Sequence, residues 1–205
     1  RPIRPVSAVN SMETYLGRCS PGDRNQSLIR EAVSACRARR NSNSRSIPGH
    51  WEADLMLFAK YGQAILTLHE RTSRILIAQR PANKTADLIA GQLRQVLQLM
   101  PQPLRQTVTF DNGTEFARHF LLHDLALKTY FCDTHSPWQK GGIENANGRL
   151  RRWLPRNIDI DGVSDEEIQD IILTANLTPR KCLAFKTPFQ AILAELGKDV
   201  QIRFS

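Results

Sequence analysis

Residues 50–59 decide the fold, and they read His50-Trp51-Glu52-Ala53-Asp54-Leu55-Met56-Leu57-Phe58-Ala59. Apolar strand formers dominate this run, so residues 52–59 are predicted to form a buried β-strand that carries Asp54 among apolar neighbours. Two more runs of strand formers follow at residues 64–71 and 74–80. Because only short turn signals at Tyr61-Gly62 and Thr72-Ser73 separate the three runs, we expect an antiparallel meander.

Beyond the meander, helical and strand patterns alternate. Residues 84–100 repeat apolar positions at helical spacing until two prolines end the pattern, and residues 107–110 read as a fourth strand. The remaining segments are predicted as a helix over 115–127, a strand over 128–133, and helices over 142–153, 165–177 and 188–196. This order predicts the α/β class, with a mixed five-stranded sheet flanked by helices.

The chain divides into three predicted regions. Residues 1–46 are rich in Pro, Ser, Asn and Arg and are predicted to be a basic, poorly structured arm, with a candidate short helix over 26–39. Residues 47–196 are predicted to form one compact core, and residues 197–205 a tail. Residues 1–50 hold nine of the 28 Lys and Arg residues and three of the 20 acids, hence +6 of the net charge of +8. Such a balance favours a polyanionic partner.

Composition excludes several classes of protein. With 205 residues and 41% hydrophobic content the chain can bury a real core, unlike a disulfide-stabilised miniprotein. Its four cysteines are scattered and match no zinc-site spacing, so we expect free thiols. Neither a run of 18 apolar residues nor a secretory leader is visible, so we expect an intracellular protein without a membrane partner.

Three acids are the main candidates for chemistry. Asp54 lies in the first strand, Asp111 at the end of the fourth strand, and Glu144 in the first turn of the third helix. Each has an ordinary alternative. Asp54 could be a strand-edge residue, Asp111 could belong to the turn Asp111-Asn112-Gly113, and Glu144 could be an acid that the helix dipole favours in a first turn. Together, three acids on rigid supports suit a pair of divalent cations that act on a phosphodiester.

Four segments of the chain resemble the DDE transposases of bacterial insertion sequences, of the type called the IS-thirty family. They are PGHWEADL from Pro48, TFDNGTEF from Thr109, YFCD from Tyr130 with SPWQKGGIENANG from Ser136, and PRKCL from Pro179 with KTP from Lys186. The resemblance covers residues 47–194. It implies an integrase-type catalytic core with the RNase H-like, retroviral-integrase-like fold.

The resemblance also implies a site, an activity and partners. Asp54, Asp111 and Glu144 match the family's metal-binding catalytic triad, with 32 residues between the last two. The resemblance implies two Mg²⁺ ions, with Mn²⁺ as a substitute. These ions support cleavage at transposon ends and attack of the freed 3′-hydroxyl on target DNA. The implied partners are transposon-end DNA, target DNA and further copies of the chain on that DNA, in the cytoplasm at the bacterial nucleoid.

The third helix is predicted to contact DNA. Glu144, Asn147 and Arg151 share one face of this helix with Gly148, and Arg149 and Arg152 flank that face. With Lys140 before the helix and Arg156 after it, residues 140–156 hold five cations and one anion, a candidate phosphate-binding strip. The alternative is a solvated charged helix. Arg180-Lys181 could likewise touch phosphate or be merely exposed.

Departures from the family pattern leave other readings open. Ala53 stands where Gly is usual, Gly142-Ile143 replaces a polar pair, and Thr178 stands where Arg is common. Residues 1–46 do not match the family's helix-turn-helix region, so a catalytically silent DNA-binding remnant of a truncated transposase is the alternative function. A stand-alone ribonuclease of the same fold is disfavoured, because the segments after Glu144 resemble transposases.

Several other side chains are weaker candidates. His119 and His123 have a metal-ligand spacing on a predicted helix, but core packing is favoured because no acid of the H-E-x-x-H type separates them. His50 and His135 could orient the acids or a water molecule. Trp138 could stack on a base or fill the core.

Overall fold

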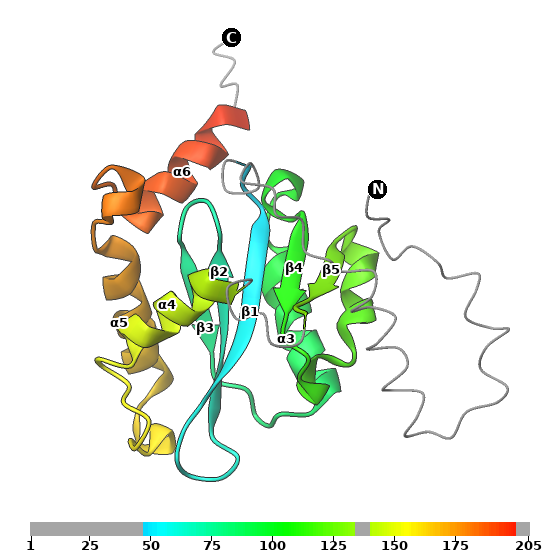
Figure 1. Cartoon of the computed structure of the whole chain (residues 1–205), viewed down its shortest axis with the longest axis vertical. Coiled ribbons are helices and arrows are strands. Elements are labelled where there is room, and N and C mark those ends of the chain that lie inside the picture. The colour runs from blue at the N-terminus through cyan, green and yellow to red at the C-terminus, as the bar shows by residue number, and fades with distance from the viewer. Residues whose placement is uncertain (1–46, 134–139, 200–205) are drawn as a thin grey trace, which may run out of the picture.

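The computed structural model describes residues 47–133 and 140–199 (Figure 1). The predicted arm over residues 1–46 lies outside the described residues, as do residues 200–205 of the predicted tail. His135 and Trp138 lie outside them as well, so the roles suggested for these two side chains stay predictions. No helix among the described residues is long and apolar enough to cross a membrane.

A mixed sheet of five strands forms the centre of the fold, as predicted. In chain order the strands are β1 His50–Leu57, β2 Ala64–Glu70, β3 Leu76–Gln79, β4 Thr107–Phe110 and β5 Lys128–Phe131. Their spatial order is β3-β2-β1-β4-β5, so β1 is the central strand. β1, β2 and β3 form the predicted antiparallel meander, whereas β4 pairs with β1, and β5 with β4, in parallel.

Helices cover both faces of this sheet. They are α3 Ala86–Gln98, α4 Gly141–Leu150, α5 Asp165–Leu177 and α6 Pro188–Asp199. α3 lies behind the sheet in Figure 1, and α4 crosses in front of it. Accordingly, α3 packs its apolar face in one hydrophobic cluster with β1, β4 and β5, and α4 and α5 pack in a second cluster with the opposite face of the meander.

The alternation of β1 sends its side chains to both layers. Trp51, Ala53 and Leu55 belong to the cluster on the α3 face, and Met56 belongs to the cluster on the α4 face. Because side chains alternate along a strand, Glu52 and Asp54 share the face of Met56. The strand therefore presents two carboxylates to α4 while its other face is apolar.

The predicted helix over residues 115–127 is wrong. Two 3₁₀ helices occupy this stretch, η4 Thr114–Phe116 and η5 His119–Leu125, and Ala126 ends the second with a φ of 58°. Contacts with the next strand explain the departure: His119 Nδ1 and His123 Nε2 each lie 2.8 Å from Thr129 Oγ1 of β5. Tertiary contacts thus override local helix propensity here.

Candidate active site

Two neighbouring parallel strands bring Asp54 and Asp111 to the same level of the sheet. Glu52 of β1 is registered with Thr109 of β4, and the two aspartates lie two residues further along these strands. Ligands of α/β sheets gather at such carboxyl ends. The side-chain contacts agree with this position, because both aspartates contact the same ammonium group, that of Lys140.

Lys140 lies between the two aspartates, just before α4. Its Nζ is 2.8 Å from Asp54 Oδ1 and 3.3 Å from Asp111 Oδ2, and 8% of the side chain is exposed. Burial alone lowers the pKa of Lys140, but the charges and hydrogen bonds of the two aspartates outweigh it and raise that pKa above its ordinary value. Lys140 is thus the buried counter-charge of the two acids in this structure, and its predicted contact with DNA stays a prediction.

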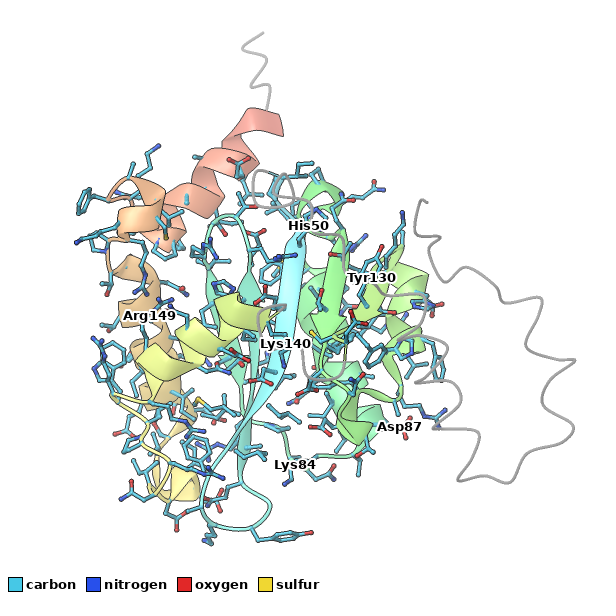
Figure 2. The ribbon with its side chains drawn as sticks, in the orientation of Figure 1. His50, Lys84, Asp87, Tyr130, Lys140 and Arg149 are labelled. Carbon is cyan, nitrogen blue, oxygen red and sulfur yellow. The ribbon has the colours of Figure 1, made fainter. Side chains whose placement is uncertain are left out.

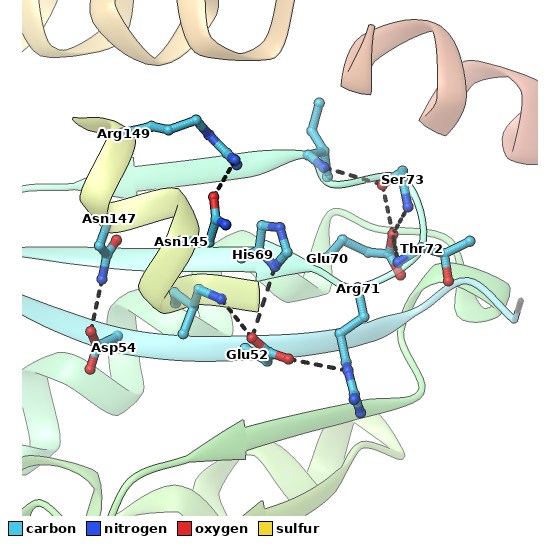
Figure 3. A network of polar contacts seen from close by, with 12 residues as sticks. Glu52, Asp54, His69, Glu70, Arg71, Thr72, Ser73, Asn145, Asn147 and Arg149 are labelled. Atoms are coloured by element: carbon cyan, nitrogen blue, oxygen red, sulfur yellow. Dashed lines mark hydrogen bonds and ion pairs between the residues drawn. The ribbon is translucent and has the colours of Figure 1, made fainter. Parts of the chain in front are cut away.

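Asn147 holds the other oxygen of Asp54. Its Nδ2 donates a hydrogen bond of 2.8 Å to Asp54 Oδ2, from the second turn of α4 (Figure 3). This contact orients Asp54, and the predicted DNA contact of Asn147 stays a prediction. Asp111 is fixed by its own turn, where its Oδ1 accepts a hydrogen bond from the backbone N–H of Gly113.

Glu144 reaches the same pocket as Asp54 without completing a cluster of three acids. The pocket is open and is lined by Asp54, Leu55, Met56, Leu57, Glu144, Asn147, Gly148, Arg151 and Arg156. Glu144 is exposed in the first turn of α4. Within residues 47–133 and 140–199, no group of three or more His, Cys, Asp or Glu side chains is close enough to share one metal ion.

The donor set of the aspartates suits a hard divalent cation. Asp54 and Asp111 already place carboxylate oxygens around a single cation, the ammonium of Lys140. Mg²⁺ is commonly held by one or two carboxylates, with water and phosphate oxygens completing its octahedron. Asp54 and Asp111 therefore offer oxygens of the kind that would hold one such ion in place of the Lys140 ammonium, and Glu144 lines the adjoining pocket.

Glu52, which the sequence analysis did not single out, anchors α4. Its side chain is buried, its Oε2 accepts a 2.7 Å hydrogen bond from the backbone N–H of Ile143, and its Oε1 lies 3.1 Å from Arg71 Nε (Figure 3). Lys140 at the N-cap forms no side-chain cap, so Glu52 satisfies the first turn of the helix from another element. Burial nevertheless raises the pKa of Glu52.

Gly142 explains one departure from the family pattern. A Cβ at this position would lie 2.7 Å from Glu52 Oε2 and 3.0 Å from two ring atoms of His69. The start of α4 therefore sits directly on the Glu52 carboxylate only because residue 142 has no side chain. Glu52 precedes Asp54 by two residues on the same strand face, which is the one sequence signal that could have drawn attention to it.

Some arginines of the predicted basic strip line the pocket and others do not, and their contacts with DNA stay predictions. Arg151 and Arg156 line the pocket, and Arg151 Nη2 donates a 2.6 Å hydrogen bond to the backbone carbonyl of Leu57. Arg149 extends from α4 toward α5 instead (Figure 2) and donates a hydrogen bond to Asn145. Arg152 is exposed and does not line the pocket.

The weaker histidine candidates have structural contacts. His50 Nδ1 lies 2.8 Å from Thr107 Oγ1 at the start of the β1–β4 pair, four residues before Asp54. His119 and His123 share the hydroxyl of Thr129, and burial lowers the pKa of His119 to about 4. Packing therefore accounts for both residues of this pair, as the sequence analysis favoured.

This fold and site define a class of protein. A mixed five-stranded sheet with helices on both faces, and one aspartate from each of two adjacent parallel strands, is an RNase H-like integrase core. No family model matches the chain. Curated relatives, however, are similar to it over most of its length.

Three of these relatives come from different bacteria. The transposase for insertion sequence element IS1086 of Cupriavidus metallidurans is 43% identical over 157 residues, which cover 76% of this chain and 46% of that protein. The transposase InsI for IS30A of Escherichia coli is 38% identical over 157 residues, 76% of this chain and 40% of that protein. The transposase for IS4351 of Bacteroides fragilis is 35% identical over 145 residues, 68% of this chain and 43% of that protein.

These relatives confirm the family resemblance that the four motif segments indicate. Over its matched residues the chain belongs with the IS30-type transposases of bacterial insertion sequences. The chain spans less than half of the length of the curated relatives it matches.

Proposed function

We propose that the chain is the catalytic core of an insertion-sequence transposase, which cleaves DNA at transposon ends and transfers the freed strand into target DNA. The observation that carries the proposal is the convergence of Asp54 and Asp111 on one cation position, next to a pocket that Glu144 also lines. The transposase relatives supply the reaction class.

In this proposal the three acids hold two Mg²⁺ ions, with Mn²⁺ as a substitute. When bound, such ions activate the attacking oxygen and stabilise the leaving oxygen of a phosphodiester. Asp54 and Asp111 provide oxygen ligands from the rigid sheet, and Glu144 provides one from the first turn of α4. Asn147 fixes the orientation of Asp54 through its 2.8 Å hydrogen bond.

Arg151 and Arg156 would bind the DNA backbone at the pocket. Both line it beside Asp54, and guanidinium groups match phosphate oxygens well. Gly148 lines the same pocket and has open space above its Cα, which lets a backbone phosphate approach α4 closely. Two DNA ends and a target must be held together for strand transfer, so we propose that at least two copies of the chain act on DNA.

The experiment uses a duplex that carries the terminal inverted repeat of the insertion sequence that encodes the chain. With Mg²⁺, wild-type protein should nick this duplex, and Asp111→Asn should lower the rate by roughly a thousandfold or more, because a missing ligand removes transition-state stabilisation of about 4 kcal/mol. DNA affinity should change little. Asp124→Asn is the matched control, since Asp124 on η5 is exposed and pairs with Arg94 of α3, away from the pocket.

Two outcomes would contradict the proposal. Nicking by Asp111→Asn at the wild-type rate would remove Asp111 from the metal site. Binding without nicking by the wild-type protein in Mg²⁺ or Mn²⁺ would favour the silent DNA-binding remnant. Titration of Mn²⁺ by electron paramagnetic resonance gives a readout independent of activity, and Asp111→Asn should weaken that binding.

A further inference from the structure

Four arginines from three elements lie together on the side of α4 that faces α5. They are Arg74 in the turn between β2 and β3, Arg149 in the last turn of α4, Arg152 in the turn that follows α4, and Arg180 just after α5; we name them the arginine cluster. Arg152 follows the end of α4 by two residues, and its charge acts on both Arg149 and Arg180. In Figure 2 the Arg149 side chain extends from α4 toward α5.

Hydrogen bonds between side chains and backbone groups hold the other two arginines near α4. Asn176 of α5 forms hydrogen bonds with both backbone groups of Leu76, at 2.9 Å and 2.7 Å, so the end of α5 lies against the start of β3, two residues from Arg74. Arg180 Nη2 donates a 2.7 Å hydrogen bond to the carbonyl of Ala175 and is thereby held against the same helix end. The packing of α5 against β3 therefore fixes the positions of Arg74 and Arg180.

No acid neutralises the arginine cluster. Within the described part of the chain, none of its four members takes part in an ion pair, and the Arg149 side chain donates a hydrogen bond to the neutral amide of Asn145. Arg180 Nε is buried and has no hydrogen-bond partner. Burial lowers the pKa of Arg149, and the neighbouring charges of Arg180, Arg74 and Arg152 lower it further, while the Cys182 thiol opposes them in part.

The buried His69 beneath α4 reports the same positive field. Burial, together with the charges of Arg74, Arg149, Arg71 and Arg180, lowers its pKa to about 3. Of these, Arg71 has a counter-ion, since its Nε lies 3.1 Å from Glu52. Crowded cations without an anion are unfavourable unless a bound anion compensates them.

The chemistry of the cluster fits a DNA backbone. Planar guanidinium groups bind phosphate oxygens in pairs, and an array of them on several elements suits a row of phosphates better than one small anion. Exposed Lys181 and Lys186, in the loop that follows Arg180, extend the positive surface. Contacts to phosphates alone carry no sequence information, so the DNA recognised here can have any sequence.

This surface is separate from the catalytic pocket. Arg149 follows Glu144 by five residues, which places it about 140° further around the helix axis. Arg151 and Arg156 line the pocket, whereas the four residues of the arginine cluster do not. One helix thus separates two positively charged surfaces.

We propose that the arginine cluster is a second DNA-binding surface, which holds a duplex of any sequence other than the duplex whose strand is cut at the pocket. In the transposase proposed above, that second duplex is the target. The proposal rests on the proposed function for this assignment, but the binding of a second duplex is measurable without any cleavage.

The experiment measures binding of a fluorescent duplex of random sequence, by anisotropy, over a series of salt concentrations. Arg149→Gln/Arg152→Gln should weaken binding about tenfold or more at low salt and reduce the slope of log K against log salt by about two, because two phosphate contacts are lost. Arg74→Gln, from another element, should reduce the slope by about one. Arg94→Gln/Arg118→Gln is the matched control, since these exposed arginines pair with Asp124 and Asp87 beyond the opposite face of the sheet.

The activity arm separates this proposal from the proposed function. Arg149→Gln/Arg152→Gln should nick transposon-end DNA at a rate within about twofold of wild type, and should lose most strand transfer into a separate target duplex. If the wild-type protein does not nick the DNA, the proposed catalytic function is contradicted. The anisotropy measurement would still test DNA binding by the arginine cluster.

Either of two results would overturn the second surface. One is a slope of log K against log salt that is unchanged in Arg149→Gln/Arg152→Gln and in Arg74→Gln, when both variants unfold at the same temperature as wild type. The other is competition by polyglutamate that matches competition by an unlabelled duplex of equal charge, which would identify the cluster as a site for an acidic protein. Arg149→Lys/Arg152→Lys should retain most of the slope, because it keeps both charges.

Discussion

Glu52 and Asp54 lie two residues apart on the same face of β1, yet their surroundings differ. Glu52 is 2% exposed, and its partners are a backbone N–H and a guanidinium that packs beside it. Asp54 is partly exposed beside an open pocket, and its partners are the side chains of Lys140 and Asn147. A carboxylate held by backbone at a closed interface supports the fold, whereas one held by side chains at a pocket can exchange those partners for a ligand.

The first way to break this comparison is to remove each carboxylate in turn and measure the free energy of unfolding. Glu52→Ala should lower the free energy of unfolding by about 3 kcal/mol, because the buried N–H of Ile143 and the guanidinium of Arg71 lose their partner. Asp54→Asn should lose at most about half of that, because Lys140 keeps Asp111 as a counter-charge. Urea denaturation measures both losses, and equal losses would contradict the comparison. Glu52→Gln, which keeps an acceptor for Ile143, should lie between Glu52→Ala and wild type.

A second way to sharpen the comparison uses pH, because His69 lies 4.0 Å from Glu52. The pKa of His69 is lowered from 6.5 to about 3, so between these values the unfolded chain binds more protons than the folded protein. The resulting stability is complete above pH 6.5 and is lost as the pH falls toward 3. Between pH 6.5 and 5 the loss should be about 2 kcal/mol.

The check for this pH effect is a difference between two proteins. Urea denaturation of wild type and of His69→Gln at pH 5 and pH 7 isolates the contribution of His69 from those of other groups, including Glu52, whose raised pKa acts in the opposite direction. The variant should show a shallower fall in stability on acidification. A parallel fall in both proteins would mean that His69 titrates normally.

The smallest expected effect concerns the contact between α4 and Glu52. Gly142→Ala gains helix propensity but forces a Cβ to within 2.7 Å of Glu52 Oε2, so we expect a net loss of about 1 kcal/mol. Gly148→Ala in the same helix meets nothing within 4 Å and should gain up to about 1 kcal/mol from propensity alone. Thermal unfolding of the two variants should therefore shift in opposite directions, and shifts of the same sign would argue against a tight seat for α4.

Local patterns predicted much of the fold. The meander follows from alternating strand formers with tight turns, and the helix predicted over residues 165–177 is found at those bounds as α5 Asp165–Leu177. Ser164 and Glu167 form a capping box there, which is a signal contained in four residues. Where the stabilising contacts are local, the sequence is sufficient.

The parts that sequence missed depend on contacts between distant residues. Lys140 is 86 positions from Asp54, and Ile143 is 91 positions from Glu52. No pattern along the chain distinguishes a lysine that will be buried between two acids from one that will contact solvent. Residues 114–125 differ from the prediction for another reason: a hydroxyl on the following strand β5 contacts two histidines, and the chain forms 3₁₀ turns.

The contact of Asn176 with Leu76 has a consequence for the solubility of the fold. β3 is an edge of the sheet, and an edge strand with free backbone groups is a template for pairing with another chain. Asn176 takes both backbone groups of Leu76, and Gln169 donates a 3.0 Å hydrogen bond to the carbonyl of Ala78. Two amide side chains of α5 thus imitate a sixth strand, and they close this edge against aggregation.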